Sequence, residues 1–173
     1  MKRPALKILV PMLAGVCVLL ASVKTDHDHS TDFSRFKTYS WLKVEATDSL
    51  WADRIRNDID EQLQKKGWTR VESGGDVAIS AFGRVRNEQT LVTFYDGIGG
   101  GWRWRGLGNT ATTTVENTPV GTLVVHIFEG DSKKLVWTGT SSETLSEKAD
   151  KNEKKLEKAI AEMFDSFPPK PRG

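Results

Sequence analysis

The strongest constraint on the fold is a stripe of apolar side chains that recurs every four residues between positions 49 and 66. The stripe consists of Trp51, Ile55, Ile59 and Leu63. Charged and amide residues fill most of the positions between them. Because residues four apart lie on one face of an α-helix, the pattern predicts an amphipathic helix over 49–66. Asp48 or Ser49 can cap the start of this helix, and Gly67 can cap its end.

A second amphipathic helix is predicted near the C-terminus, over residues 147–164. Its apolar face holds Leu156, Ile160, Met163, Phe164 and the following Phe167. Lysine and glutamate residues occupy most of the remaining surface. Pro168 and Pro169 end the helix, and we expect residues 168–173 to form a disordered, proline-rich tail.

The other segments have the composition of β-strands. We expect strands over 33–44, 76–85, 110–115, 123–128 and 134–140, with a short apolar return over 68–71. The turn residues at 130–132 predict that the last two strands form a hairpin. Each helix has one stripe to bury, and the strands have one more apolar face. We therefore expect an α+β fold in the order β-α-β-β-β-β-α, with an antiparallel or mixed β-sheet of about five strands and both helices packed on one face.

Residues 1–22 have the features of a secretory signal peptide. A positively charged start precedes an apolar run over 8–21, which ends in small residues. This run is too short to span a bilayer of about 30 Å at about 1.5 Å per residue. We expect cleavage after Ala21 or Ser22, which leaves a single α+β domain over 23–167. The alternative is an uncleaved N-terminal anchor.

Cys17 raises the further alternative of a lipoprotein. A lipidation site has a small residue directly before the cysteine, whereas this chain has Val16 there and Gly15 one place too early. We therefore favour simple cleavage. Loss of the three basic residues in 1–22 changes the balance from 25 to 22 basic against 23 acidic residues and removes the only Cys. Without an overall basic field, nucleic-acid binding is not expected.

Short blocks in a fixed order run through the chain after residue 22. They are Asp32-Phe33, Tyr39-Ser40-Trp41, Lys66-Gly67-Trp68, Asp76-Val77, a Gly/Trp-rich middle, 121–125, 135–139 and Phe167-Pro168-Pro169. Together they resemble the Domain of Unknown Function 4136 family of bacterial envelope proteins. The resemblance implies an exported single domain, frequently a lipoprotein, with no established activity, so it transfers no catalytic residues. We accordingly expect a periplasmic or otherwise exported protein that contacts the membrane only through an uncleaved or lipidated N-terminus.

Asp26, His27, Asp28 and His29 form the densest set of potential metal ligands. On a strand, the two histidines would point to the same face, and the carboxylates could complete a Zn²⁺ or Cu²⁺ shell. The spacing matches no structural zinc site, and the only other histidine is His126, in an apolar segment that favours a structural role. We therefore favour a polar leader into the first strand and expect no cofactor.

Residues 94–109 form a glycine-rich loop that contains Trp102, Arg103, Trp104 and Arg105. If the loop is locally extended, both tryptophans lie on one face and both arginines on the other. Trp and Arg are the residues most enriched at binding hot spots, and they suit anionic headgroups and glycan rings. The loop therefore predicts a surface for an envelope protein, a glycan or a lipid. An alternative of equal weight is a hairpin end whose tryptophans fold back onto the sheet.

No catalytic arrangement accompanies these motifs. The chain after residue 22 has no Cys and no Gly-x-Ser-x-Gly motif, and Leu107 stands where a phosphate-binding loop needs Lys. We therefore expect an exported cell-envelope protein that is a non-catalytic binding or structural module. The alternative is a metal-binding protein or a metal-dependent enzyme organised by the Asp26–His29 cluster.

Overall fold

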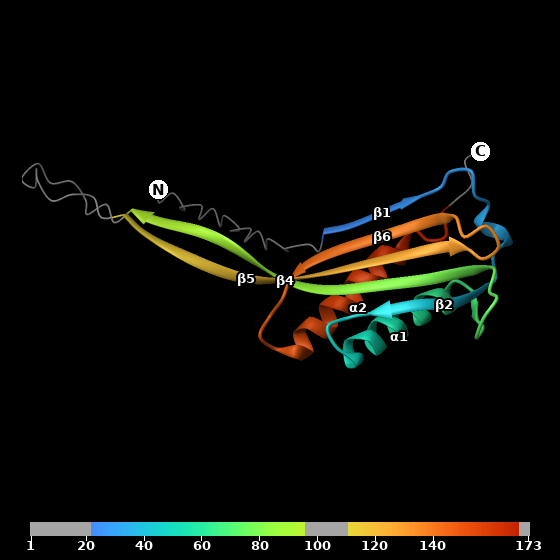
Figure 1. Ribbon diagram of the computed structural model, residues 1–173, viewed down its shortest axis with the longest axis horizontal. Coiled ribbons are helices and arrows are strands. Elements are labelled where there is room, and N and C mark those ends of the chain that lie inside the picture. The colour runs from blue at the N-terminus through green and yellow to red at the C-terminus, as the bar shows by residue number, and fades with distance from the viewer. Residues whose placement is uncertain (1–21, 96–110, 170–173) are drawn as a thin grey trace, which may run out of the picture.

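The computed structural model describes residues 22–95 and 111–169. Its strands are β1 Ser22–His27, β2 Thr38–Glu45, β3 Thr69–Arg70, β4 Val77–Tyr95, β5 Ala111–Glu129 and β6 Leu135–Thr144. Its helices are α1 Ser49–Lys65 and α2 Ala149–Asp165, and a single 3₁₀ turn, η1, covers Phe33–Arg35. Figure 1 shows one extended sheet from which the ends of β4 and β5 protrude.

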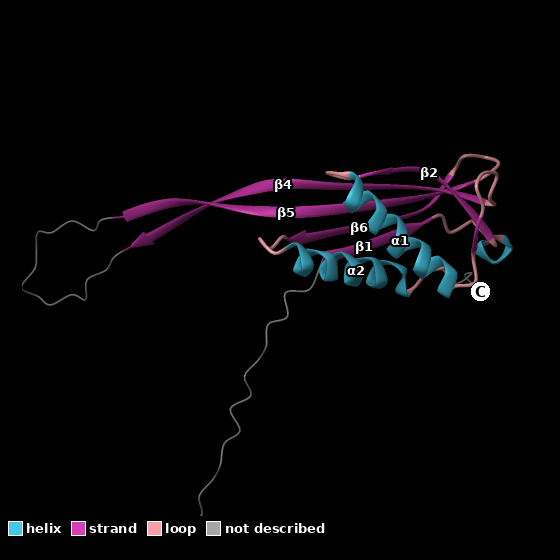
Figure 2. Ribbon diagram, turned by 90° about the horizontal axis from the view of Figure 1, so that it is seen from below, coloured by secondary structure: helices cyan, strands magenta, loops and turns pink. Residues whose placement is uncertain are grey.

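The six strands form a mixed sheet in the order β1-β6-β5-β4-β2-β3. β2 runs parallel to β3 and β4, whereas the β1–β6, β5–β6 and β4–β5 pairs are antiparallel. Both helices cover the same face of the sheet (Figure 2). The predicted α+β fold is confirmed, with six strands where we expected about five.

The hydrophobic core lies between the helices and this sheet face. The helices contribute Ile55, Ile59 and Leu63 from α1 and Ile160, Met163 and Phe164 from α2. Alternate residues of the central strands also line the core, namely Val77, Ile79 and Ala81 of β4 and Leu123, Val125 and Ile127 of β5. The same cluster includes the mostly aromatic set Phe33, Phe36, Tyr39, Trp68, Val136, Trp137 and Phe167. Each large apolar side chain contributes about 1.5–3 kcal/mol on full burial, so the two stripes hold the helices on the sheet.

The predicted start of α1 and the predicted hairpin are confirmed, whereas α1 ends one residue earlier than predicted and α2 covers 149–165 in place of the predicted 147–164. A carboxylate oxygen of Asp48 accepts a hydrogen bond from the backbone N–H of Trp51 at 3.0 Å and caps α1. Gly67 follows the helix with a φ of 81°, which is the left-handed conformation that glycine adopts most easily. β5 and β6 pair antiparallel across the turn after Glu129, as the residues at 130–132 predicted.

The predicted first strand over 33–44 is wrong at its start. Phe33–Arg35 form the turn η1 because a carboxylate oxygen of Asp32 accepts the backbone N–H of Ser34 at 2.9 Å. This hydrogen bond fixes a turn in place of an extended chain. The strand itself begins at Thr38.

We predicted a polar segment without regular structure before that strand. This prediction is also wrong, because Ser22–His27 form strand β1. β1 pairs antiparallel with β6 from Ser22–Ser142 to His27–Trp137. Of its side chains, only Val23 packs against the core as a partly buried hydrophobic residue. An edge strand with so little apolar content carries almost no alternation from which it could be predicted.

Two predicted strands are a single one. Residues 111–115 and 123–128 both belong to β5, and β4 continues past the predicted end at residue 85 to Tyr95. Phe94, where we expected the loop to begin, is therefore part of β4, and residues 96–110 lie outside the described range. Pro169 and the residue before it are half-buried after α2, and residues 170–173 of the predicted tail lie outside the described range.

Candidate binding arm and neighbouring sites

The main departure from a two-layer body is a two-stranded arm. β4 and β5 stay paired through Asn87–Tyr95 and Ala111–Pro119, which we call the arm. The last pair between β5 and β6 is Val120–Thr144, so no third strand accompanies these residues in the described structure. With about 3.4 Å per residue, the arm extends about 30 Å from the body (Figure 1).

Local sequence explains why β5 can leave the sheet. Pro119 lacks a backbone N–H, so it suits the point where β5 becomes an edge strand. Its carbonyl accepts the backbone N–H of Leu145 at 2.7 Å, directly after β6 has ended. Beyond this point each strand of the arm has one edge with which no strand of the described residues pairs, and an edge of this kind can accept a partner strand.

The two faces of the arm differ in character. Odd-numbered positions of β4 continue the face that is buried by the helices in the body, and on the arm this face is open. Leu91 and Val115 lie directly opposite each other on it, with 69% and 51% of their surfaces exposed. The other face carries the ion pair between Arg86 and Glu88, at 2.7 Å. The arm therefore presents an exposed apolar pair on one side and charges on the other.

The predicted binding residues Trp102, Arg103, Trp104 and Arg105 lie outside the described residues. They belong to the segment that connects Tyr95 to Ala111 along the chain. Tyr95 and Ala111 are paired with each other at the end of the arm farthest from the body. The segment that contains the four residues therefore starts and ends at the tip of the arm.

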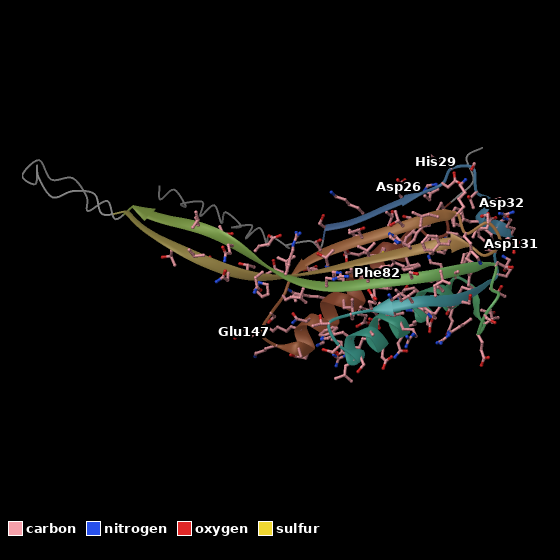
Figure 3. All side chains as sticks on the ribbon, viewed as in Figure 1. Asp26, His29, Asp32, Phe82, Asp131 and Glu147 are labelled. Carbon is pink, nitrogen blue, oxygen red and sulfur yellow. The ribbon has the colours of Figure 1, made fainter. Side chains whose placement is uncertain are left out.

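The Asp26–His29 cluster lies at the opposite end of the body from the arm (Figure 3). His27 Nε2 and His29 Nδ1 are 3.1 Å apart. We expected the two imidazoles on one face of a strand. They instead meet across a turn, because β1 ends at His27.

The carboxylate of Asp28 already has partners. It accepts hydrogen bonds from Lys134 Nζ at 2.7 Å and from the hydroxyls of Thr31 and Ser30. These contacts, with Lys134 first, hold the pKa of Asp28 well below its usual range. Among residues 22–95 and 111–169, no three His, Cys, Asp or Glu side chains are grouped to hold a metal ion. The metal site stays a prediction.

A buried carboxylate that the sequence did not single out is Asp60 of α1, which is 7% exposed. Its Oδ1 accepts hydrogen bonds from the Tyr39 hydroxyl at 2.8 Å and from Trp41 Nε1 at 2.9 Å. Its Oδ2 accepts one from Arg70 Nη1 at 2.9 Å. Burial, together with the adjacent carboxylate, raises the pKa of Tyr39. With three donors satisfied, Asp60 fastens α1 to β2 and β3 and is not free for chemistry.

A small apolar cavity of about 160 Å³ lies between the two helices and the sheet, at the root of the arm. Its walls include Trp51, Ile55, Leu123 and Leu156. The amine of Lys155 at its rim already donates to the Thr144 carbonyl at 2.6 Å. The cavity therefore offers packing space and no reactive pair.

His126 does not lie in the core. Its neighbours Val125 and Ile127 point into the core, so His126 projects from the opposite face of the sheet, and it is half-buried there. Its ring centroid lies 6.1 Å from that of Phe82 and 5.9 Å from that of Phe128. The sequence predicted a structural histidine within an apolar strand, and the structure places it in an aromatic cluster on the surface.

The described helices include none that is long and apolar enough to cross a membrane. The family model described as a domain of unknown function, DUF4136, matches residues 23–169. No curated protein matches the sequence.

Two solved structures show a similar fold. A PDZ domain protein from Parabacteroides distasonis is 16% identical with a TM-score of 0.60. The match covers 88% of this chain but 36% of that protein, so this chain spans about a third of its length. The PelC dodecamer from Paraburkholderia phytofirmans is 11% identical with a TM-score of 0.50, over 84% of this chain and 96% of that one. At these identities the similarity concerns the fold alone.

Proposed function

This chain belongs to the DUF4136 family, and on that premise we propose that it is an exported cell-envelope protein acting as a non-catalytic binding or structural module. The arm is the observation that carries the proposal. It bears an exposed apolar pair and two strand edges that no other described strand pairs with, and the segment containing Trp102–Arg105 connects its last pair, Tyr95 and Ala111, along the chain. An isolated two-stranded ribbon is only marginally stable in water, so contact with a partner gives the arm a physical role.

The position of Ser22 determines where an uncleaved or lipidated N-terminus would hold the body. Ser22 pairs with Ser142, Ser142 pairs with Thr122, and Thr122 pairs with Arg84 at the root of the arm. The chain therefore enters the body level with the point where the arm leaves it. A tether before Ser22 would hold the root of the arm close to the surface to which the protein is attached.

The proposal is tested with the double variant Trp102→Ala/Trp104→Ala in the exported protein. Binding is measured in parallel to purified envelope proteins, to peptidoglycan and to vesicles with anionic headgroups. We expect the wild-type chain to bind one of the three and the double variant to lose at least about tenfold in affinity, because removing aromatic anchors typically costs more than about 1.4 kcal/mol.

The matched control is Leu50→Ala, which removes another strongly exposed apolar side chain, on α1. We expect this variant to bind like the wild type. Equal binding by the double variant would contradict the role of the tip, and failure of the wild-type chain to bind any of the three probes would contradict the binding function.

A metal-binding function is the second candidate, and the 3.1 Å approach of the His27 and His29 rings is the observation in its favour. Elemental analysis of the exported protein, compared with His27→Ala/His29→Ala, tests it. Bound Zn²⁺ or Cu²⁺ that disappears in the variant would support the site. A metal-free wild-type protein that is unaffected by chelators would exclude it.

A further inference from the structure

The sheet face opposite the helices carries a patch that the arm proposal does not use. Register alone defines it, because residues directly opposite each other on paired strands share a face. We call the patch the open face. It consists of Ala78, Ser80 and Phe82 of β4, Val124, His126 and Phe128 of β5, and Leu135, Thr138 and Thr140 of β6. None of these nine side chains is Asp, Glu, Lys or Arg. They are flanked by β1 on one side and β2 on the other.

Four charges mark the corners of the open face. One row of opposed residues runs from Lys24 of β1 through Thr140, Val124 and Phe82 to Glu45 of β2. The next row runs from Asp26 of β1 through Thr138, His126 and Ser80 to Lys43 of β2. Each row therefore ends in opposite charges, and each strand edge carries both signs. The pattern is complementary to itself after rotation by a half turn.

We propose that the open face binds the open face of a second copy of this chain, related by a two-fold axis that runs along β5. This rotation keeps each row in register and exchanges its ends. Lys24 of one copy then faces Glu45 of the other, and Asp26 faces Lys43. The central strand faces its own copy, so that Phe128 meets Phe128. The product is a four-layer sandwich with the helices outside and the two sheets inside.

The alternative two-fold axis, across the strands, preserves the charge pairing but not the packing. It would place Phe128 over Thr122 and Ala78 over Arg84, because it reverses the order of the rows. Burying the Arg84 guanidinium without a partner costs several kcal/mol. The axis along β5 pairs apolar with apolar rows and leaves Arg84 at the margin. Aligned sheets cross at about 30°, and the long side chains of Lys and Glu can span the resulting offset.

The open face is large enough for a weak, reversible dimer. Five strands spaced about 4.8 Å apart are about 24 Å wide, and the length from Ala78 to Phe82 at about 3.3 Å per residue is about 17 Å. The footprint is therefore about 400 Å² per copy, or about 800 Å² in total, in the size range of small, transient interfaces. In this dimer both arms leave the body in the same direction.

The experiment exchanges the corner charges in the protein as the cell processes it, and measures the dimer dissociation constant by analytical ultracentrifugation. We expect a dimer for the wild type. K24E and E45K each place like charges opposite one another twice per dimer and should weaken it about fivefold to tenfold. The double variant K24E/E45K restores opposite charges across the axis and should recover most of the affinity lost by E45K. With the axis across the strands, the double variant would be the weakest of all.

Two further variants test the centre of the open face. V124D and H126D each place two carboxylates against each other, and we expect dissociation constants at least about a hundredfold higher, with unchanged circular dichroism because both side chains are half-exposed in one copy. L50D, on the exposed side of α1, is the matched control and should dimerise normally. A wild-type chain that is still monomeric at about 0.1 mM, a hundredfold above a micromolar dissociation constant, would overturn the proposal. A dimer unaffected by V124D and H126D would also overturn it.

Discussion

Replacing Asp60 by Ala tests whether one buried carboxylate fastens the first helix to the sheet. The substitution removes the acceptor shared by Tyr39, Trp41 and Arg70. Tyr39 is completely buried, so its hydroxyl would lose a 2.8 Å hydrogen bond without access to water. The side chain of Arg70 is 49% exposed and can be solvated instead. The free-energy cost of losing the Asp60 acceptor therefore differs among the three donors.

The expected cost follows from this difference. A buried donor left without an acceptor costs about 1–3 kcal/mol, which applies in full to Tyr39. The half-buried indole N–H of Trp41 adds about 1 kcal/mol, and the exposed Arg70 pair adds less than about 1 kcal/mol. We expect Asp60→Ala to lower the free energy of unfolding by about 3 kcal/mol. For a domain stabilised by about 5–15 kcal/mol this is a large fraction.

Urea unfolding measures this loss as a shift of the midpoint at constant slope. A double-mutant cycle with Tyr39→Phe isolates the cost of the unsatisfied Tyr39 hydroxyl, because phenylalanine has no hydroxyl that could lose its acceptor. We expect the double variant to be about 1–2 kcal/mol more stable than the sum of the single losses predicts. A loss below about 1 kcal/mol for Asp60→Ala, or strictly additive losses, would refute the role assigned to this carboxylate.

Three further changes probe other parts of the chain. Burial, with a smaller contribution from Glu157, raises the pKa of Asp58 from 3.8 to about 6, so the folded state loses stability as the pH rises through this range. Asp58→Asn should therefore stabilise the protein by about 1–2 kcal/mol at pH 7 and by nothing below pH 3.8. Thermal unfolding at both pH values measures the difference. Gly139→Ala places a methyl group against Met163, which is 1% exposed, and should cost about 1–3 kcal/mol in urea unfolding. Replacement of the arm by an Asn-Gly turn should change the free energy of unfolding by less than about 1 kcal/mol, because the arm contributes no side chain to the core cluster, and calorimetry checks this.

The helices were predictable because each has a strict period and a polar boundary. Ile55, Ile59 and Leu63 recur at helical spacing, and their burial is what the pattern requires. The capping residues around this stripe are local in sequence, so the boundary of α1 followed from the sequence as well. The placement of both helices on one face followed from the need to bury one stripe each.

The missed strands lack such a pattern for physical reasons. β1 is an edge strand whose only contribution to the core is the partly buried Val23, and its pairing is decided by β6, over a hundred residues away in the chain. The arm buries neither of its faces under a helix, so alternation fades beyond Arg84 and the strand lengths were underestimated. Asp60 was missed because its donors come from β2 and β3, which only the folded chain brings to α1.

The corner charges of the open face have a competing explanation, since lysines on edge strands discourage unwanted pairing between sheets. That protection needs charge at the edge, and one sign of charge is enough to provide it. This face instead carries both signs on each side: Lys24 and Asp26 lie on β1, and Lys43 and Glu45, which form an ion pair within the same chain, lie on β2. If the charges only prevented association, exchanging the charges at both positions, as in K24E/E45K, would not restore dimerisation relative to E45K. Recovery of dimerisation in K24E/E45K therefore separates complementarity from protection, independently of what the tip of the arm binds.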